Sequence, residues 1–577
     1  MLKKLKGIMS LIVVLCMVVL MFTACGGSEN QSNESESKEN SDANSSSVSE
    51  ANAGETYEYA WLSIDAPVDE GLWGQKYLED KFNIKIKIIR ADTSRWDEQV
   101  SIILATGDIP DLIWCNSIKD VGNYAKQGIL AEVKMDSIEK NMPNYYKMVN
   151  ENDPQLFSYS VIDGKNMGLA KLNANGQYPY PGAIRADWLK NVGITKPPET
   201  LQELEDIFLK FRNNDPDKNG KQDTYAISMP SDTPTPALWF QTVFGAYGAN
   251  PFFWRENNGK VEFGLVTPEV REALKLLQKW YKSEIIDPEF ITEKGRISQK
   301  DISYKFSTAK LGYMDNLRFE DYQWDNDGHL NAKWIANNPA WAEFFEKYKA
   351  DTKTLYATKN FTTFDDSVPQ PIYINIPPVK GPDGKSGYYT DGFQNQYLAF
   401  GKQIEKDQKK FDKLLQVLEV LATDEQTYIE TNFGPEGKAW ITDDKGIRQW
   451  NPNWSKDPDY HPQGLKLAAG QWANPIFWTN PNFNTVIGGE RAEQRYDRCG
   501  AIVAEYPSYQ SALKSVLPSS AETNEITNTF VKDFVIKCIA SNVDIDKEFD
   551  SMVSSWMAKG GEKLTKEAND WYQSIKK

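Results

Sequence analysis

Residues 94–114 read SRWDEQVSIILATGDIPDLIW, and this stretch decides the fold class. Apolar side chains in its first half recur at the spacing of one helix face: Trp96, Val100, Ile103 and Leu104. Gly107 ends the predicted helix, and residues 111–114 follow as an apolar strand. Neighbouring segments predict strands at 59–64 and 84–89 and a helix at 73–82. Strands that alternate with helices indicate an α/β fold.

Four further observations along the chain point to a known family. The passages read IILATGDIPDLI at 102–113, RADWLKNVG at 185–193 with PPETLQEL at 197–204, TAKLGYMDN at 308–316, and ATDEQ at 422–426 with NFGPEGK at 432–438. In this order they resemble extracellular solute-binding proteins of carbohydrate ABC transporters, the family that includes maltose-binding protein. The resemblance implies a two-lobed, periplasmic-binding-protein-like fold with crossing hinge segments and a central ligand cleft. Ligand sites of open α/β sheets and of domain interfaces agree with that expectation.

The same resemblance divides the chain into lobes. Lobe 1 is expected to hold residues 55–170 and 388–436, and lobe 2 residues 171–387 and 437–577. The crossing segments are expected near 167–173, 376–389 and 434–440, and an insertion at 317–370. The resemblance weakens after residue 440, so the assignment there rests on fewer residues.

The N-terminal residues predict export. A lysine-rich start precedes an apolar run over 8–22, which is shorter than the roughly 20 residues that a membrane span needs. The run ends in FTACGG at 22–27, which resembles the lipobox of bacterial lipoproteins, although Phe22 stands where the family usually has Leu. Residues 1–24 are therefore predicted to be a signal peptide, and Cys25 the lipidated residue that anchors the protein at the extracytoplasmic face of the cell membrane. An uncleaved anchor and an ordinary secreted protein are the alternatives.

Composition limits the partners. Residues 25–54 contain no aromatic side chain and one branched aliphatic side chain, so they are predicted to be a disordered tether.

The formal net charge of the whole chain is −16, and loss of the three signal-peptide lysines takes it to −19. Such a chain repels polyanions, which argues against nucleic acid as a partner.

Cysteine and histidine provide little material for catalysis. Beyond the signal peptide and the lipid site, the chain has Cys115, Cys499 and Cys538, and a bridge between the last two is left open. His329 and His461 are far apart in the sequence. Neither a catalytic zinc site nor a histidine-based nucleophile triad is indicated.

The loop DPDKNGKQD at 215–223 predicts a calcium site. Its ligands would follow the order of an EF-hand-type loop, with a backbone carbonyl from the lysine: Asp215, Asp217, Asn219, Lys221 and Asp223. Ala226 stands at position 12, where such loops carry a bidentate Glu. The loop lies between a predicted helix and a strand, so the Ca²⁺ is expected to be structural. The alternative is an Asp/Asn-rich turn.

Candidate ligand-binding residues combine flat aromatic faces, which suit a pyranose ring, with planar charged groups that bind its hydroxyls. They are Asp65, Asp69, Trp73, Asp187, Trp239, Phe244, Tyr247, Asp315, Arg318, Asp391 and Trp478. Phe393, Trp472 and Phe477 are considered with them, and Asp187 and Trp188 match the motif of the family. For each aromatic the alternative is core packing, and for each charged residue it is a solvated surface position.

The resemblance implies a lipid-anchored, non-enzymatic receptor, expected to be a monomer, that delivers a carbohydrate to the permease subunits of an ABC transporter. Aromatic residues make up 12% of the chain, which favours an oligosaccharide. One alternative is the same fold with a peptide or another solute. The other is a surface enzyme that acts on glycosides, because 81 acidic residues leave a catalytic carboxylate pair unrecognisable in sequence.

Overall fold

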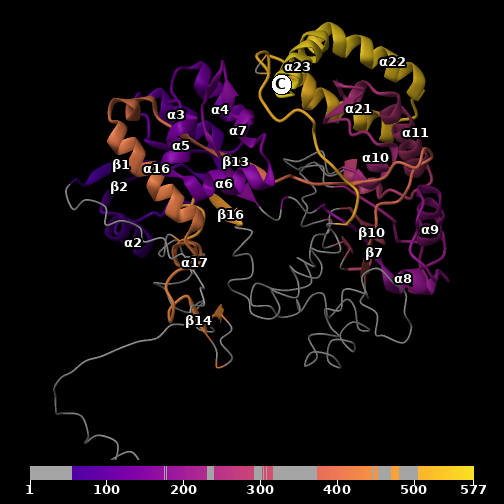
Figure 1. Cartoon of the computed structure of the whole chain (residues 1–577). Helices are drawn as coiled ribbons and strands as arrows, with labels where there is room; N and C mark the ends of the chain where they lie inside the picture. Colours follow the sequence, from indigo (N-terminus) through magenta and orange to yellow (C-terminus); the bar gives the residue numbers. More distant parts are fainter. Residues whose placement is uncertain are drawn as a thin grey trace, which may run out of the picture. The chain divides into compact units, whose positions relative to one another are not determined.

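The structure of the chain is a computed structural model, drawn in Figure 1. It describes residues 55–173, 176, 179–229, 239–291, 302, 305–306, 308–315, 373–442, 444, 448–451, 469–479, 505–520 and 522–576. The predicted signal peptide, Cys25, the tether, Arg318, Cys499 and the predicted insertion therefore lie outside the described residues. The chain from Thr56 to Lys577 forms one unit, which contains two large hydrophobic cores.

A six-stranded mixed sheet forms the centre of the first core, with strand order β16, β6, β13, β3, β1, β2. The strands are β1 Tyr57–Leu62, β2 Ile84–Ile89, β3 Leu112–Cys115, β6 Leu169–Asn173, β13 Gln394–Phe400 and β16 Phe477–Thr479. β1 pairs in parallel with β2 and β3, and β16 with β6, whereas β13 runs antiparallel to β3 and β6. All strands except β13 therefore end at one edge, where α/β sheets bind ligands.

The helices of the first core pack around this sheet. They are α2 Trp73–Phe82, α3 Trp96–Ala105, α4 Ile118–Lys126, α5 Met135–Asn141, α6 Pro143–Asn152, α7 Leu156–Tyr159, α16 Gln408–Thr423 and α17 Glu425–Phe433. α3 and β3 confirm the helix and strand predicted from residues 94–114. Asp407 caps α16, because its carboxylate accepts a hydrogen bond from the Lys410 amide at 3.0 Å. Figure 1 shows α16 beside α5 and α6.

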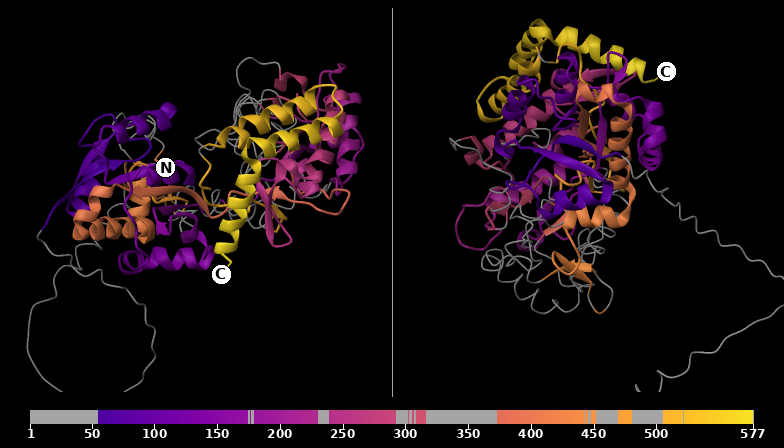
Figure 2. Two further views of the ribbon diagram at one scale, coloured as in Figure 1. Left: turned by 90° about the horizontal axis from the view of Figure 1, so that it is seen from above. Right: turned by 90° about the vertical axis from the view of Figure 1, so that its left-hand side faces the viewer.

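The second core combines a small antiparallel sheet, of order β10, β7, β11, with helices from distant parts of the chain. Its elements are β7 Gly182–Arg185, β10 Tyr313–Met314, β11 Tyr373–Ile376, α8 Ala186–Asn191, α9 Leu201–Asn213, α10 Gln241–Tyr247, α11 Pro268–Lys282, α20 Asn524–Thr527, α21 Thr529–Ala540, α22 Ile545–Trp556 and α23 Glu562–Ser574. α21 and α22 pack on α11, and α23 packs on β9 of the hairpin formed by β8 Trp254–Asn257 and β9 Lys260–Phe263 (Figures 1 and 2). The rings of Phe263 and Trp556 stack at 5.2 Å. The C-terminal helices thus belong to the second core.

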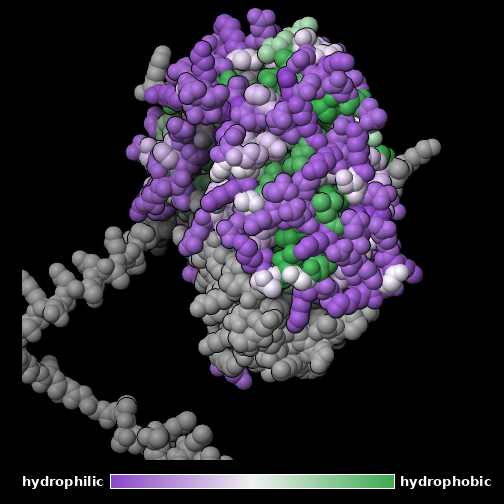
Figure 3. Space-filling view, turned by 90° about the vertical axis from the view of Figure 1, so that its right-hand side faces the viewer, coloured by the Kyte–Doolittle hydropathy of each residue, from purple (hydrophilic) through white to green (hydrophobic). Residues whose placement is uncertain are grey.

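The surface is predominantly polar where Figure 3 shows it. Hydrophilic side chains cover most of this side of the molecule, on which α8, α9 and α11 lie, and apolar side chains are scattered among them. Within the described ranges, no helix combines the length and the apolar character that a membrane crossing needs.

The chain crosses between the cores slightly later than predicted. β6 extends the first sheet to Asn173 and β7 starts the second at Gly182, so the first crossing lies between these two residues and not at 167–173. The second crossing lies between β12 (Tyr388–Tyr389) and the start of β13, at the end of the predicted segment 376–389. The difference arises because residues 169–173 form a buried strand, whose apolar pattern the prediction assigned to a linker.

Residues 437–479 differ most from the predicted lobe boundaries. Trp440 packs with Ile429 against Trp73, and Trp472 belongs to the first core. β16 then extends the first sheet beside β6. The prediction placed all of 437–577 in lobe 2, but the described residues of this part reach the second core only after β16. The return predicted near 434–440 therefore joins two parts of the first core, because Trp440 needs the apolar surface of α17 to bury its ring.

Candidate functional site

Three segments that join the two cores lie side by side, around Tyr180, Tyr389 and Tyr509; we call them the crossing segments. The Tyr180 amide donates a hydrogen bond to the Tyr389 carbonyl at 2.8 Å, and the Gly392 amide donates to the Gly176 carbonyl at 2.8 Å. β12 pairs in parallel with β17 (Ser508–Tyr509), which adds the third segment. Backbone hydrogen bonds thus join chain segments that are more than 100 residues apart in sequence.

Gln241, the first residue of α10, ties two of these segments to the second core. Its buried side-chain Nε2 donates to the Tyr180 carbonyl at 2.7 Å, and its Oε1 accepts from the Tyr389 amide at 2.9 Å. Both ends of the amide are satisfied by backbone groups, as a buried polar side chain requires. The position of α10 therefore sets the position of the crossing segments.

Four aromatic rings gather on and beside the crossing segments; they are Tyr180, Phe253, Tyr389 and Tyr509, and we call them the hinge aromatic cluster. Tyr180 and Tyr389 stack with ring centres 5.9 Å apart. Phe253 lies 5.3 Å from Tyr389 and 6.3 Å from Tyr509. All four residues are half-buried. Sequence reasoning missed this cluster, although YPYP at 178–181 and GYYTDG at 387–392 were available signals.

Asp391 lies beside the hinge aromatic cluster. Its Oδ2 accepts a hydrogen bond from the Tyr180 hydroxyl at 2.6 Å. Burial, and secondarily the charge of Asp391, raises the pKa of the Tyr389 hydroxyl well above its ordinary value, so that hydroxyl stays a donor. Gly176 makes the close approach possible, because a Cβ there would lie 2.1 Å from the Gly392 carbonyl oxygen. Of the predicted ligand residues, Asp391 is the one that the structure brings to the crossing segments.

The carboxyl edge of the first sheet adds charged groups. Asp65 follows β1 and accepts a hydrogen bond from the Thr93 hydroxyl at 3.3 Å. Lys171 belongs to β6 of the same sheet and is fully buried. Its ammonium group donates a hydrogen bond to Gln471 Oε1 at 2.8 Å. Its ammonium lies 5.9 Å from the centre of the Trp114 ring. Burial lowers the pKa of Lys171 to about 7, and the nearby Asp65 carboxylate opposes that shift. Sequence reasoning did not single out Lys171.

Two predicted aromatic ligand residues on the second lobe belong instead to its core. Trp239 is 1% exposed and Phe244 is fully buried. The Trp239 ring meets Phe252 edge-to-face at 5.7 Å. These two residues were candidates because of their aromatic faces, but both rings are buried, on α10 and in the turn before it. Two further candidates are buried in the first core: Phe393 and Trp472.

The remaining candidates are dispersed. Trp73 is half-buried and stacks on Tyr77 at 5.0 Å. Asp69 is exposed and Tyr247 is packed against the second core. Asp187 forms a 2.5 Å ion pair with the buried Arg185, while Trp188 lies in the second core. The side chains of Phe477 and Trp478 lie outside the described residues.

Asp315, another predicted ligand residue, is buried at the end of β10. Its Oδ1 accepts hydrogen bonds from the Thr242 hydroxyl at 2.5 Å and from the Tyr313 hydroxyl at 3.1 Å. Burial raises the pKa of the Asp315 carboxyl to about 6, against the effect of these hydrogen bonds. The carboxyl therefore faces the N-terminal turn of α10, the helix that carries Gln241.

The predicted calcium loop forms a tight turn. Asp215 accepts hydrogen bonds from the amides of Asn219 and Gly220, at 3.1 and 2.9 Å. The Asn219 side chain donates to both Asp217 and Asp223, at 2.7 and 3.0 Å. Burial, together with the neighbouring aspartates, raises the pKa of Asp217, and its Oδ1 is buried with no hydrogen-bond partner. Four oxygen-bearing side chains thus converge, and the unpartnered Oδ1 fits a bound cation.

Two observations indicate that this loop is not preformed for binding a metal ion. The ammonium of Lys310 lies 2.6 Å from Asp223 Oδ2. In the part of the chain that the structure describes, no group of three or more His, Cys, Asp or Glu side chains is arranged as a metal site. Binding of Ca²⁺ would therefore require Lys310 to release Asp223.

Comparison with known proteins supports the fold and the resemblance. Residues 63–314 match the family described as bacterial extracellular solute-binding protein. The chain is 24% identical over 523 residues to lipoprotein LipO of Bacillus subtilis (strain 168), which covers 89% of this chain and 91% of LipO. It is 23% identical over 540 residues to the polygalacturonan/rhamnogalacturonan-binding protein YtcQ of the same organism, which covers 90% and 91% of the two chains. The predicted resemblance to solute-binding proteins is confirmed.

Solved structures confirm the α/β, two-lobed fold class. An extracellular solute-binding protein from Bifidobacterium longum subsp. infantis superposes with a TM-score of 0.63 at 17% identity, over 90% of this chain and 98% of the other. The Streptococcus pneumoniae ABC-transporter substrate-binding protein FusA in complex with kestose gives 0.59 at 18% identity, over 90% and 99%. An EF-hand mutant of FusA in complex with fructo-nystose gives 0.57 at 17% identity, over the same shares.

Proposed function

We propose that this chain is a solute-binding protein that captures an oligosaccharide outside the cytoplasm and delivers it to the permease subunits of an ABC importer. One observation carries the proposal: the hinge aromatic cluster and Asp391 lie together on the segments that join two α/β cores. The family match over 63–314 supports the transport role, and the names of YtcQ and FusA support a carbohydrate ligand. The chain acts by binding and does not transform its ligand.

The chemistry of the cluster suits a sugar. Half-buried tyrosine and phenylalanine rings offer flat apolar faces for the C–H side of a pyranose or furanose, and tyrosine hydroxyls offer polar edges. The Asp391 carboxylate accepts hydrogen bonds from hydroxyl groups, as it does from Tyr180. Four rings in one cluster offer more stacking surface than one sugar residue can cover, which favours an oligosaccharide.

The position of the cluster provides a mechanism. A ligand held at the crossing segments can contact groups of both cores only when they close around it, so binding shifts the population towards the closed state. A change from mostly open to mostly closed needs on the order of 5 kcal/mol of differential affinity. A few stacked rings and several hydrogen bonds are sufficient for that.

The remaining assignments follow from the sequence. We infer that Cys25 carries the lipid that holds the protein, as a monomer, at the outer face of the membrane. We also infer that Asp215, Asp217, Asn219, Lys221 and Asp223 hold a structural Ca²⁺. When bound, the ion would neutralise the carboxylates that raise the pKa of Asp217 and would rigidify the loop between α9 and the following bridge residue Tyr225. FusA, which has the same fold, carries an EF-hand that was altered in one of its solved structures, and this supports a calcium loop here.

The decisive experiment is calorimetric titration of the purified protein with a panel of defined oligosaccharides. The same samples are analysed afterwards by mass spectrometry for cleaved products. We expect saturable binding of at least one glycan without cleavage. Tyr389→Ala should weaken that binding, whereas Tyr281→Ala, which removes a ring that packs against the second core away from the crossing segments, should not. Cleavage of the bound glycan would show an enzyme, and binding of peptides alone would contradict the carbohydrate assignment.

A further inference from the structure

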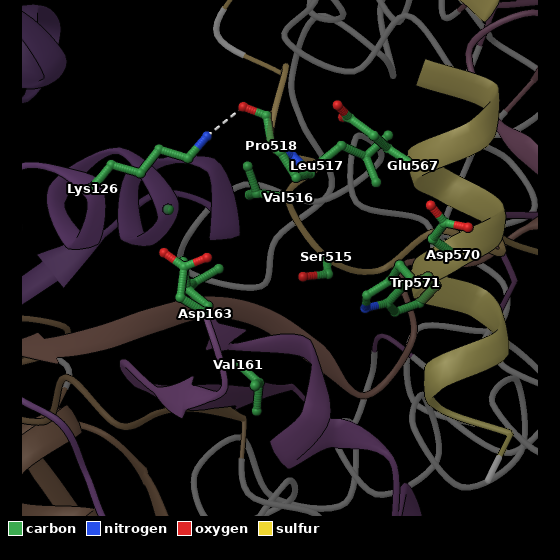
Figure 4. A pocket seen from close by; sticks show the side chains of 12 residues that line it. Lys126, Val161, Asp163, Ser515, Val516, Leu517, Pro518, Glu567, Asp570 and Trp571 are labelled. Carbon is green, nitrogen blue, oxygen red and sulfur yellow. Dashed lines mark hydrogen bonds between the residues drawn. The ribbon is translucent and has the colours of Figure 1, made fainter. Parts of the chain in front are cut away.

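A pocket lies between elements of both cores, apart from the hinge aromatic cluster. Its volume is about 260 Å³. It is lined by Gly122 and Lys126 of α4, residues 161–163, residues 515–518, and Glu567, Asp570 and Trp571 of α23. Figure 4 shows the three side chains of α23 on one side of the space and Lys126 and Asp163 on the other.

Ser515 provides a buried polar group in this pocket. The residue is 8% exposed, and its Oγ is buried without a hydrogen-bond partner. Figure 4 shows the side chain in the middle of the pocket, between Asp163 and Trp571. A buried hydroxyl without a partner costs free energy, so native proteins normally satisfy it with protein, water or ligand. The hydroxyl is therefore available to a small molecule.

The charges of the lining favour a cation. Three carboxylates, those of Asp163, Glu567 and Asp570, face one ammonium, that of Lys126. That ammonium already donates to the Pro518 carbonyl at 2.6 Å. Glu567 accepts from the Ser519 amide and hydroxyl, at 3.0 and 2.7 Å, and Asp570 pairs with Lys566. Among the described residues, Asp163 has neither a hydrogen bond nor an ion pair, so its charge is left for an occupant.

Trp571 provides an aromatic ring in the lining of the pocket. Its ring is partly buried, contacts both hydrophobic cores, and lies 6.5 Å from Tyr159. Indole is the best aromatic face for an ammonium group. Val161, Val516 and Leu517 add apolar surface beside it. An aromatic face, an available carboxylate, a free hydroxyl and apolar walls together match a compact organic ammonium ion.

We propose that this pocket binds a small organic cation of the quaternary ammonium type. Its walls are continuous with a crossing segment, because Ser515 follows Tyr509 by a few residues on the same stretch of chain. An occupant that holds residues 515–518 against α4 and α23 restrains that segment. Binding in the pocket and binding at the hinge aromatic cluster are then coupled, and the coupling is reciprocal.

The test uses choline chloride as the probe, with 3,3-dimethylbutan-1-ol as its neutral isostere and sodium chloride as the ionic control. Calorimetry of the mature protein should show one choline site and no binding of the alcohol. Asp163→Asn should weaken choline binding about threefold, since the exposed carboxylate of Asp163 forms only a solvent-screened ion pair with the cation. Asp80→Asn, which removes an exposed carboxylate on α2, should leave it unchanged. Asn tolerates the left-handed backbone of residue 163, where φ is 50°, so the variant keeps its fold.

Hydrogen exchange provides an independent measurement. Choline should slow exchange in peptides that cover 505–520, and not in peptides that cover α2. Ser515→Ala and Trp571→Leu should abolish that protection. If Trp571→Leu unfolds the protein, the Asp163 and Ser515 variants decide. Failure of choline to bind, equal binding of the alcohol, or full binding by Asp163→Asn would each overturn the proposal. None of these results depends on whether the protein binds a glycan.

Discussion

The Tyr180 hydroxyl donates a 2.6 Å hydrogen bond to the Asp391 carboxylate across 211 positions of sequence. The two residues lie on different crossing segments, and the Tyr180 amide also donates to the Tyr389 carbonyl. The ring, the hydroxyl and the backbone amide of Tyr180 thus all contact the crossing segment that carries Tyr389 and Asp391. The same residues form part of the proposed sugar site, so hinge geometry and ligand recognition share their atoms.

Tyr180→Phe should weaken both properties while keeping the ring. Loss of a hydrogen bond to a charged group should lower the free energy of unfolding by about 1–2 kcal/mol, measured by urea denaturation. Glycan affinity should fall as well, since Asp391 loses the group that orients it. Tyr572→Phe is the control, because among the described residues the Tyr572 hydroxyl forms no hydrogen bond, and the substitution keeps the ring that packs against the second core and under Lys576. An unchanged affinity in Tyr180→Phe would remove Asp391 from the site.

Trp239 and Tyr389 should respond in opposite ways to truncation. Trp239→Ala opens a cavity in the second core and should lower the free energy of unfolding by about 3–5 kcal/mol. The remaining folded protein should bind glycan normally. Tyr389→Ala should cost less stability and more affinity, because its ring is half-buried on a crossing segment. Melting curves and calorimetry on both variants distinguish the two residues; loss of affinity in a stably folded Trp239→Ala would contradict the core assignment.

Asp315 should give the protein a stability that falls as pH rises from about 4 to 6.5. Burial raises the pKa of its carboxyl to about 6 in the folded state, above its value in the unfolded chain. The folded state therefore binds more protons in this window, and ionisation of Asp315 destabilises it by on the order of 1–3 kcal/mol. Asp315→Asn stays neutral and keeps an acceptor for Thr242.

The measurement for Asp315 is the difference in unfolding free energy between wild type and Asp315→Asn as a function of pH. The variant should become more stable relative to the wild type as pH rises from about 4 to 6.5, and the difference should be constant above pH 7. A flat difference throughout would show that the carboxyl titrates normally.

Calcium should raise the melting temperature of the wild type relative to a sample in chelator, because an ion bound only by the folded state stabilises it. Asp217→Asn should abolish that increase, and Asp206→Asn, which changes an exposed residue of α9, should not. Lys310→Met should strengthen calcium binding, because Asp223 is then released from its ion pair. Identical melting curves with and without chelator would leave an ordinary Asp/Asn turn.

Cys25→Ala should release the protein from membranes. The predicted lipobox makes this cysteine the acceptor of the lipid, so metabolic labelling with a fatty acid should be lost in the variant. Cys115→Ser is the control, since that thiol is buried in the first sheet. Persistent labelling of Cys25→Ala would contradict the anchor.

The alternation of helices and strands could be predicted from the sequence because it depends on local patterns of apolar residues. The sequence IKIKII predicted β2, and Ile84, Ile86 and Ile88 are indeed buried, while the two lysines between them are exposed. The ligand residues were less accessible to prediction. A half-buried ring such as Tyr389 and a fully buried one such as Trp239 look alike in a sequence, and only the pairing of distant segments tells them apart. Lys171 was missed for the same reason, because its site forms only when β6 pairs beside β13.

The lobe boundaries failed at Trp440 and Trp472, where the resemblance was weakest. Both side chains are buried, but a single sequence does not say against which core a tryptophan packs. The core is defined by contacts between residues that are distant in sequence. For example, Trp61 Nε1 donates a hydrogen bond to the Trp472 carbonyl, which only the three-dimensional structure reveals.

The interleaving of the two cores has a consequence for biosynthesis. The first sheet is complete only when β16 is available, and the second core only when α23 has been made. A nascent chain that has emerged as far as α17 therefore carries two unfinished cores, both with exposed apolar surface. Folding must follow synthesis instead of accompanying it, and many of its contacts join residues hundreds of positions apart, which slows it. Such a chain reaches its folded state only after its last helix has been made.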